Sequence, residues 1–324
     1  YIVLLIVDNL FWIVFSLLII RLIVWIFYLS AALKTNNDLL KHFSIFFKFN
    51  ILKPVLKISI WIMIVNIVGP IILYSDRFLI SSLISLTAVT FYSTPYEMVT
   101  KLLILPTAFV GVLFPAFSAS YAADPDLASS LFKRSAKFVF IILFPIIFLI
   151  TVFSFEGLSI WLDTEFANKS VLVLQYLAIG ILFSSISSIP NNFFQGIGKP
   201  HIPAILNLIE LPIYILFMYL FIQWFGIVGA AFFWMIAAGI DAVINYLIAY
   251  LKFGIKLENS LIIVMFLFLL LTYLLPFNLD VPLIKILVSM ITIVGFFFIS
   301  WNMILLDDEK KYFIEKISNL WNRR

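Results

Sequence analysis

Lysine and arginine gather in every second loop of this chain, and this pattern limits the possible folds more than any other feature. The chain contains 21 Lys and Arg, of which 16 fall in alternate polar segments between long apolar stretches, whereas the other loops hold only Lys169. The basic segments contain Lys34, Lys41, Lys48, Lys53, Lys57, Lys133, Arg134, Lys137, Lys199, Lys252, Lys256, Lys310, Lys311, Lys316, Arg323 and Arg324. A membrane protein with several spans keeps basic loops on the cytoplasmic side, so the sorting predicts both the class and the orientation.

The apolar stretches have the length of membrane spans, since a helix needs about 20 residues to cross a bilayer. We expect spans at residues 10–32, 58–80, 88–117, 137–156, 170–190, 202–223, 227–250, 259–277 and 282–304. The predicted fold is therefore an all-α polytopic membrane protein with about nine transmembrane helices. If the first of these spans starts outside, the C-terminus lies in the cytoplasm, which agrees with the basic tail.

Composition supports this class and excludes several others. The chain is 64% hydrophobic and 12% charged, whereas soluble domains are about 45–50% apolar and about 25% charged. It contains no Cys, which rules out disulfides and thiolate sites. Its basic residues are spread along one membrane side, which indicates contact with anionic lipid and not with nucleic acid. Because no HExxH, Ser/His pairing or phosphate-binding glycine loop occurs, we expect a protein without catalytic residues, metal or cofactor.

The two ends of the first predicted span suggest how it is connected. The chain opens at Tyr1 inside an apolar run, which predicts that residues 1–7 end an earlier span of a longer protein. Residues 36–57 are amphipathic and basic, as in a helix that lies at the cytoplasmic membrane surface. This segment is either a linker between two lobes or a loop with an apolar face.

Charged residues inside the apolar spans are the candidate functional residues, because each costs about 2.5–3.5 kcal/mol at the centre of a membrane helix unless it faces protein or water. These residues are Arg21, Asp76, Arg77, Glu97, Lys101, Glu210, Asp241 and Lys285. Arg21 is in mid-span, too far from the interface to be a simple anchor, so we expect it to face a cavity and meet an anion. Lys285 is near the outer end of its span and is expected to reach the interface.

The spacing of the other charges leaves two interpretations open for each group. Glu97 and Lys101 are four residues apart, so they either form an ion pair or line a polar cavity. The adjacent Asp76 and Arg77 either anchor the outer end of their span or face the cavity. Two further sets share a helix face and fit either hydrogen bonds between helices or a hydrophilic pathway. These sets are Asn207 with Glu210, and Asp241 with Asn245.

Short motifs across most of residues 50–250 resemble a known family. Asp-Arg-Phe starts at Asp76, Tyr-x-x-Pro-Tyr-Glu at Tyr92 and Leu-Phe-Pro at Leu113. Gln-Gly-x-Gly-x-Pro follows at Gln195, and Gly-Ile-x-Gly-Ala-Ala at Gly226. Together they resemble polysaccharide-export flippases of the O-antigen type, which belong to the multidrug/oligosaccharidyl-lipid/polysaccharide exporter superfamily.

The resemblance implies two six-helix lobes around a central cavity, followed by two additional helices. It divides the chain into the last part of an N-terminal lobe (1–33), an amphipathic cytoplasmic linker (34–57), a six-helix C-terminal lobe (58–252), two additional spans (253–306) and a basic cytoplasmic tail (307–324). Proline residues within the spans fit a protein that rocks between inward-open and outward-open states.

The resemblance also implies a function. The expected protein lies in the bacterial inner membrane and moves undecaprenyl-pyrophosphate-linked oligosaccharide across it by alternating access, with a proton or cation as a possible coupling ion. The cationic candidates for the pyrophosphate are Arg21, Arg77 and Lys101, and the acidic candidates are Asp76, Glu97, Glu210 and Asp241. The alternatives are a drug/cation antiporter of the same superfamily and a membrane glycosyltransferase or polymerase. The absence of a large outer loop argues against the enzyme, and mid-span Arg21 argues against a scaffold without transport.

Overall fold

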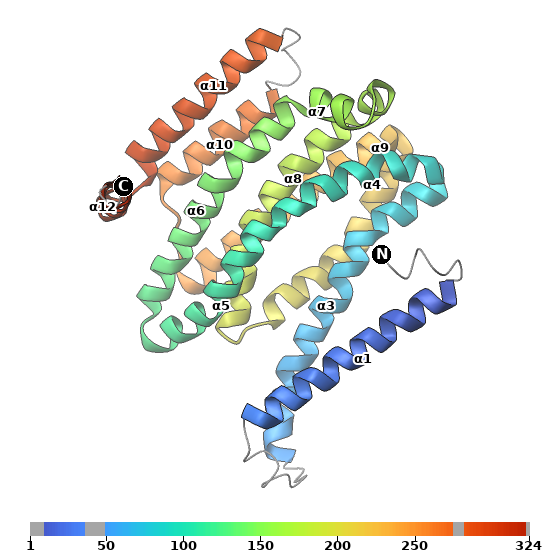
Figure 1. Cartoon of the computed structure of the whole chain (residues 1–324). Coiled ribbons are helices and arrows are strands. Elements are labelled where there is room, and N and C mark those ends of the chain that lie inside the picture. The colour runs from blue at the N-terminus through green and yellow to red at the C-terminus, as the bar shows by residue number, and fades with distance from the viewer. Residues whose placement is uncertain (1–9, 36–48, 275–281, 322–324) are drawn as a thin grey trace. The chain divides into compact units, whose positions relative to one another are not determined.

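The computed structural model describes residues 10–35, 49–274 and 282–321, and the elements in these ranges are helices (Figure 1). They are α1 (Leu10–Thr35), α3 (Phe49–Leu83), α4 (Leu86–Thr100), α5 (Ile104–Ala123), α6 (Pro125–Val152), α7 (Ser154–Trp161), α8 (Thr164–Gly196), α9 (His201–Phe253), α10 (Asn259–Leu274), α11 (Pro282–Ile299) and α12 (Asp307–Trp321). A 3₁₀ turn, η2 (Lys101–Leu103), joins α4 to α5, and a π-helical turn, η4 (Ser300–Ile304), extends α11. Most of the predicted linker, residues 36–48, lies outside the described residues.

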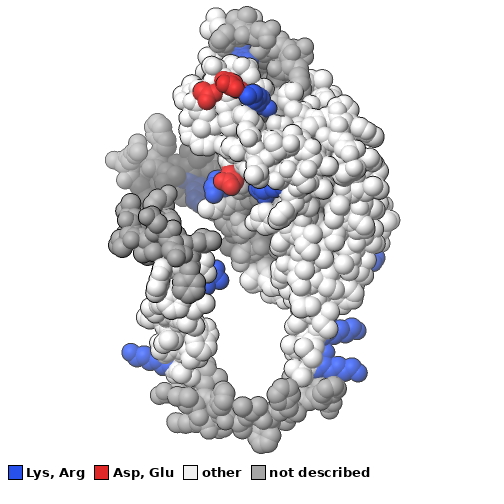
Figure 2. All heavy atoms as spheres, turned by 90° about the vertical axis from the view of Figure 1, so that its right-hand side faces the viewer, with Lys and Arg blue, Asp and Glu red and all other residues white. Residues whose placement is uncertain are grey.

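The predicted all-α polytopic class is confirmed. Within the described residues, seven segments are long and apolar enough to cross a membrane, and α10 is a shorter apolar helix. One of the seven is α9, which contains two of the predicted spans. Large apolar side chains are exposed along these helices, and charged side chains are few on the face shown in Figure 2. Such a surface is suited to lipid, because acyl chains replace water around it.

Two of the long segments are interrupted where a regular helix cannot continue. The predicted span 88–117 is not one helix: α4 ends at Thr100, and the 3₁₀ turn at Lys101–Leu103 separates it from α5. In α9 the backbone leaves the helical region at Gly226, with φ 61° and ψ −143°. This region is open almost only to glycine, because a Cβ atom would clash there. The predicted separation of spans 202–223 and 227–250 is therefore confirmed as a sharp break without an intervening loop.

The chain divides into two compact units, Tyr1–Leu56 and Lys57–Arg324. In the second unit, α8 is the central helix and packs against α4, α5, α6, α7 and α9. Close packing of α8 on α9 depends on Gly180, because a Cβ atom there would overlap the Trp234 ring. Small residues at such contacts let membrane helices approach, since burial from water gives no driving force between helices in lipid.

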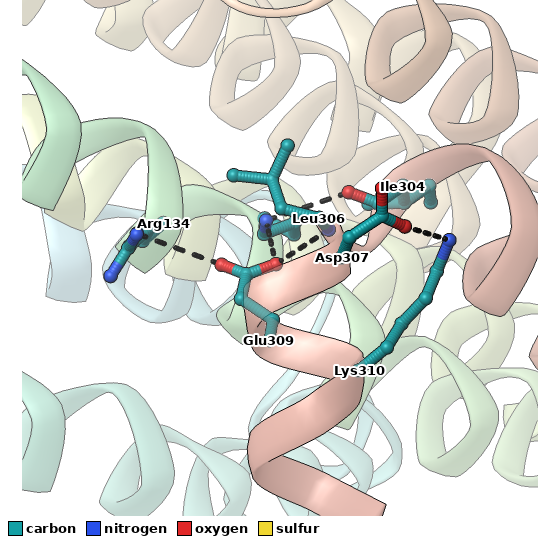
Figure 3. A network of polar contacts seen from close by, with 7 residues as sticks. Arg134, Ile304, Leu306, Asp307, Glu309 and Lys310 are labelled. Carbon is teal, nitrogen blue, oxygen red and sulfur yellow. Dashed lines mark hydrogen bonds and ion pairs between the residues drawn. The ribbon is translucent and has the colours of Figure 1, made fainter.

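The basic tail predicted at 307–324 begins with a helix, α12, whose first turn is attached to α6 (Figure 3). The carboxylate of Glu309 accepts a hydrogen bond from Lys137 Nζ at 2.5 Å and another from the Leu306 backbone N–H at 3.0 Å. Arg134 Nε lies 3.7 Å from the second carboxylate oxygen. Because Lys137 and Glu309 are both buried, this pair fixes the start of α12 against α6.

A second ion pair attaches α11 near its other end. Lys285 Nζ lies 2.7 Å from Glu156 Oε1 on α7. The expectation that Lys285 reaches out to the interface is wrong, since the residue is 8% exposed. An acidic side chain on the neighbouring helix holds the ammonium group inside the protein, and this compensates for its removal from water.

Candidate functional site

The first polar centre in the spans is built around Asp76, which has no exposed surface. Its carboxylate accepts a hydrogen bond from the Tyr92 hydroxyl on α4 at 2.6 Å and another from the Arg77 backbone N–H at 2.6 Å. A buried carboxylate needs such donors, because it has lost its contact with water. Asp76 therefore joins α3 to α4 and serves as a structural centre of the site.

The side chain of Arg77 points toward aromatic rings and not toward the Asp76 carboxylate. Its Nε donates a hydrogen bond to Ser93 Oγ at 3.3 Å, and its Cζ lies 4.4 Å from the centre of the Tyr96 ring and 5.2 Å from that of Tyr74. Cation–π contacts of this kind hold a guanidinium without neutralising it. Among the described residues, its Nη1 is buried and has no hydrogen-bond partner. The group thus retains donor capacity for an anion.

The second polar centre connects α8 to the second half of α9. Ser187 donates a hydrogen bond to Asp241 Oδ2 at 2.6 Å, and Asn245 Nδ2 donates to Asp241 Oδ1 at 2.7 Å. Asn245 Nδ2 also lies 3.2 Å from Ser187 Oγ. Asn245 and Ser187 are buried, whereas Asp241 is partly exposed. The expected sharing of one face by Asp241 and Asn245 is confirmed, and one carboxylate is held in a fixed position.

Glu210 and Asp241 come together at two neighbouring hollows. The larger, of about 370 Å³, is lined by apolar side chains from both halves of α9 and by these two acids. The smaller, of about 190 Å³, also takes in Asn207 and reaches α3 and α8. Tyr214 lines both hollows, and its buried hydroxyl has no hydrogen-bond partner among the described residues. Acidic and neutral polar groups therefore meet in an otherwise apolar part of the protein.

Glu97 and Lys101 are both exposed, and the structure shows no ion pair between these two described residues. Four-residue spacing joins side chains only while the helix continues, and α4 ends at Thr100 before Lys101 is reached. Of the two interpretations, the structure thus excludes the ion pair in this conformation. Both charges lie near the middle of the apolar segment Leu86–Ala123.

Arg21 belongs to the first compact unit, Tyr1–Leu56. It lies near the middle of α1 and is exposed, with apolar neighbours along the helix.

The sequence identified the charged members of the site but missed their partners. Those partners are Tyr92, Ser93, Tyr96 and Ser187, and Tyr214 lines the hollows beside the acids without a hydrogen bond to them. A hydroxyl or aromatic residue in an apolar span carries no distinct signal, although the Tyr-x-x-Pro-Tyr-Glu motif contains the two tyrosines of α4.

The arrangement has no metal-binding group, since no cluster of three or more His, Cys, Asp or Glu suited to a metal ion occurs in the described ranges. What remains is a set of cations, carboxylates and tyrosines on apolar helices. Fold and site together define a polytopic helical membrane protein with polar groups inside its spans.

Comparison with known proteins agrees with this class and gives the family. Residues 2–171 match the family described as "Polysaccharide biosynthesis protein", and the chain belongs to it. A protein of Shigella flexneri named "Putative O-antigen transporter" is 30% identical over 216 residues, which cover 67% of this chain and 51% of that protein. The chain thus spans about half the length of this curated relative. No solved structure matches the chain.

Proposed function

We propose that this chain contains the last part of the N-terminal lobe, the C-terminal lobe and the two additional helices of a flippase that moves a lipid-linked oligosaccharide across a membrane. Membership in the polysaccharide biosynthesis family supports the substrate class, and the name of the Shigella flexneri relative supports transport over catalysis. The carrier we propose is undecaprenyl pyrophosphate, and the membrane is the bacterial inner membrane. Residues 58–252 form the lobe and 253–306 the additional helices, with the tail in the cytoplasm as the basic loops require.

One observation carries the proposal: Glu97 and Lys101 are exposed at the centre of an apolar segment. Each such charge costs about 2.5–3.5 kcal/mol against lipid at the centre of a span. Neither has an ionic partner among the described residues to offset this cost. The side chains are therefore stable in a membrane only if this face of α4 and η2 borders other protein or water, and a hydrophilic passage at a proposed lobe interface meets that requirement.

The cations are suited to the charged end of the proposed substrate. Pyrophosphate oxygens accept hydrogen bonds from guanidinium and ammonium groups, and Arg77 has an unused donor on a side chain already held by aromatic rings. Lys101 and Arg21 supply further positive charge at mid-span. Asp76 acts indirectly in this proposal, because its bond to Tyr92 fixes the segment from which Arg77 extends.

The acids have a different role in this scheme. Glu210 and Asp241 border the same hollows and are suited to binding hydroxyl groups of a glycan or a coupling proton or cation. The interruptions at Lys101–Leu103 and Gly226 supply the bends that alternating access requires, because a segment with broken backbone hydrogen bonds tilts more easily than a continuous helix.

The test is export by the full-length protein in a flippase-null strain, scored as surface polysaccharide. Lys101→Gln and Arg21→Ala are expected to lower export with normal amounts of protein in the membrane. The matched control is Lys169→Gln, because Lys169 is also exposed but lies near the start of α8, paired with Glu165 at 2.6 Å. Failure of the unmodified gene to restore export, with normal expression, would contradict the proposal. Equal export by Lys101→Gln and Lys169→Gln would remove Lys101 from the site.

A drug/cation antiporter is the second candidate, and the larger hollow favours it. Two carboxylates in an apolar cavity of about 370 Å³ are suited to a cationic, partly apolar molecule. This function predicts that expression confers resistance to cationic dyes and that Asp241→Asn abolishes the resistance. The flippase predicts no such resistance, so growth on dye plates separates the two.

A further inference from the structure

A pocket outside the proposed passage combines positive and negative side chains at the start of α6. It has a volume of about 310 Å³ and lies between α6, the start of α10 and the turn before α12. Its basic side chains are Lys133, Arg134 and Lys137, and its acidic ones are Asp126 and Glu258. The Asp76 and Asp241 centres lie on α3, α4, α8 and α9, so this pocket is built from different elements.

The charges on α6 follow a definite order along the helix. Asp126 lies in the first turn, the hydroxyls of Ser129 and Ser130 in the next, and Lys133 with Arg134 one turn further. At 1.5 Å per residue, about 10 Å separates the acidic end from the basic one along the axis. The pocket is thus polarised, with its cations deeper along α6 and one acid near the helix start.

The basic end already binds one oxyanion of the protein itself. Glu309 forms an ion pair with Lys137 and lies near Arg134. Figure 3 labels Glu309 and Arg134. Glu309 is 8% exposed, and its Oε1 has no hydrogen bond among the described groups. Lys133 has no ion pair with any described residue, although Asp126 and Glu258 line the same pocket. One ammonium, one half-exposed guanidinium and two hydroxyls therefore remain for a second anion.

The position of the pocket indicates what kind of molecule carries that anion. Leu257, Leu261 and Leu306 add apolar lining, and the exposed Ile262 and Ile263 of α10 continue the apolar surface along the helix. On the proposed orientation, α6 starts at the cytoplasmic side and runs into the membrane. A lipid of that leaflet carries its phosphate deeper than its terminal amine, which is the order of basic and acidic groups along α6.

We propose that this pocket binds a phospholipid with a phosphoethanolamine headgroup from the cytoplasmic leaflet. Lys133, Arg134 and the two serine hydroxyls hold the phosphate, and Asp126 and Glu258 accept hydrogen bonds from the primary ammonium. A fully methylated amine keeps the charge but offers no N–H donor, so phosphatidylcholine binds more weakly. The acids also disfavour a headgroup with a net negative charge, such as phosphatidylglycerol.

The test measures lipid binding to the full-length protein by native mass spectrometry, with phosphatidylethanolamine, phosphatidylcholine and phosphatidylglycerol as probes. The unmodified protein is expected to bind phosphatidylethanolamine most tightly. Lys133→Gln and Arg134→Gln are each expected to weaken binding of all three lipids about fivefold, since a basic residue near a lipid headgroup contributes about 1 kcal/mol. Glu258→Gln is expected to retain phosphatidylcholine binding but to lose the preference for phosphatidylethanolamine. This retained binding shows that the variant is folded.

The matched control is Lys252→Gln, because Lys252 is an exposed lysine at the end of α9 that does not line this pocket. It is expected to bind all three lipids as the unmodified protein does. Equal binding of phosphatidylethanolamine and phosphatidylcholine by the unmodified protein would overturn the proposal, as would unchanged binding by Arg134→Gln. Competition by inorganic phosphate or free phosphoethanolamine at the same concentration as the lipid would show a site for a soluble phosphate and overturn the lipid assignment.

Discussion

Neutralising Glu309 is expected to release the start of α12 from α6. The change Glu309→Gln keeps the size of the side chain but removes the charge opposite Lys137, whose side chain is 5% exposed. Breaking a buried ion pair at one partner costs about 3–5 kcal/mol, because the remaining charge stays out of water. Arg134 adds little, since it is 48% exposed and 3.7 Å away. We use the lower limit of about 3 kcal/mol because the glutamine retains an acceptor for Leu306.

The measurement is limited trypsin cleavage at Lys310 and Lys311 in α12. When opening and closing are fast, the cleavage rate follows the fraction of open molecules, and 3 kcal/mol raises that fraction about 150-fold. The double variant Lys137→Met with Glu309→Met is expected to recover most of the protection, because apolar replacement of a whole buried pair is often neutral. A rise of less than about threefold for Glu309→Gln would refute this reasoning, since the pair would then contribute under about 0.7 kcal/mol.

Three other changes test contacts inside the second unit. Gly180→Ala is expected to lower the free energy of unfolding by about 1–3 kcal/mol in a denaturation assay, because the new methyl group overlaps the Trp234 ring; unchanged stability would show that the ring moves freely. Gly226→Ala is expected to cost a similar amount through backbone strain at φ 61°, which a matched Gly239→Ala change should not, since a Cβ there meets only ordinary contacts. Tyr92→Phe removes a donor from Asp76 and is expected to cost about 1.5–3 kcal/mol, and export that falls at normal stability would instead indicate a direct role in transport.

The positions of most long apolar helices could be predicted from the sequence, because a helix needs about 20 apolar residues to cross a bilayer. Apolar length determines where a helix crosses, and glycine at Gly226 has a conformation that few other residues can adopt. Apolar length does not reveal the break at Lys101–Leu103, because Leu102 and Leu103 are as apolar as the rest of the segment. Pro106 marks the break instead: it lies in the first turn of α5 and has no N–H to donate to the Leu102 carbonyl four residues earlier, so the regular helix is interrupted there.

The partners of the charged residues depend on how the helices pack, which hydropathy does not encode. Asp76 and Arg77 are adjacent in sequence, yet one binds Tyr92 and the other contacts Tyr96. Glu309 illustrates the same limit: three acidic residues, Asp307 to Glu309, are typical of a helix start and could have predicted α12. Nothing local indicated that Lys137, 172 positions away, would be its partner.

The two ion pairs that flank α11 determine how the last part of the chain can move. Lys285 is tied to α7 on one side of this helix and Glu309 to α6 on the other, so α11 is held at both ends to the same bundle. These two attachments oppose both sliding of α11 along its axis and rotation about that axis. We therefore expect α11 and the start of α12 to follow any tilting of this bundle.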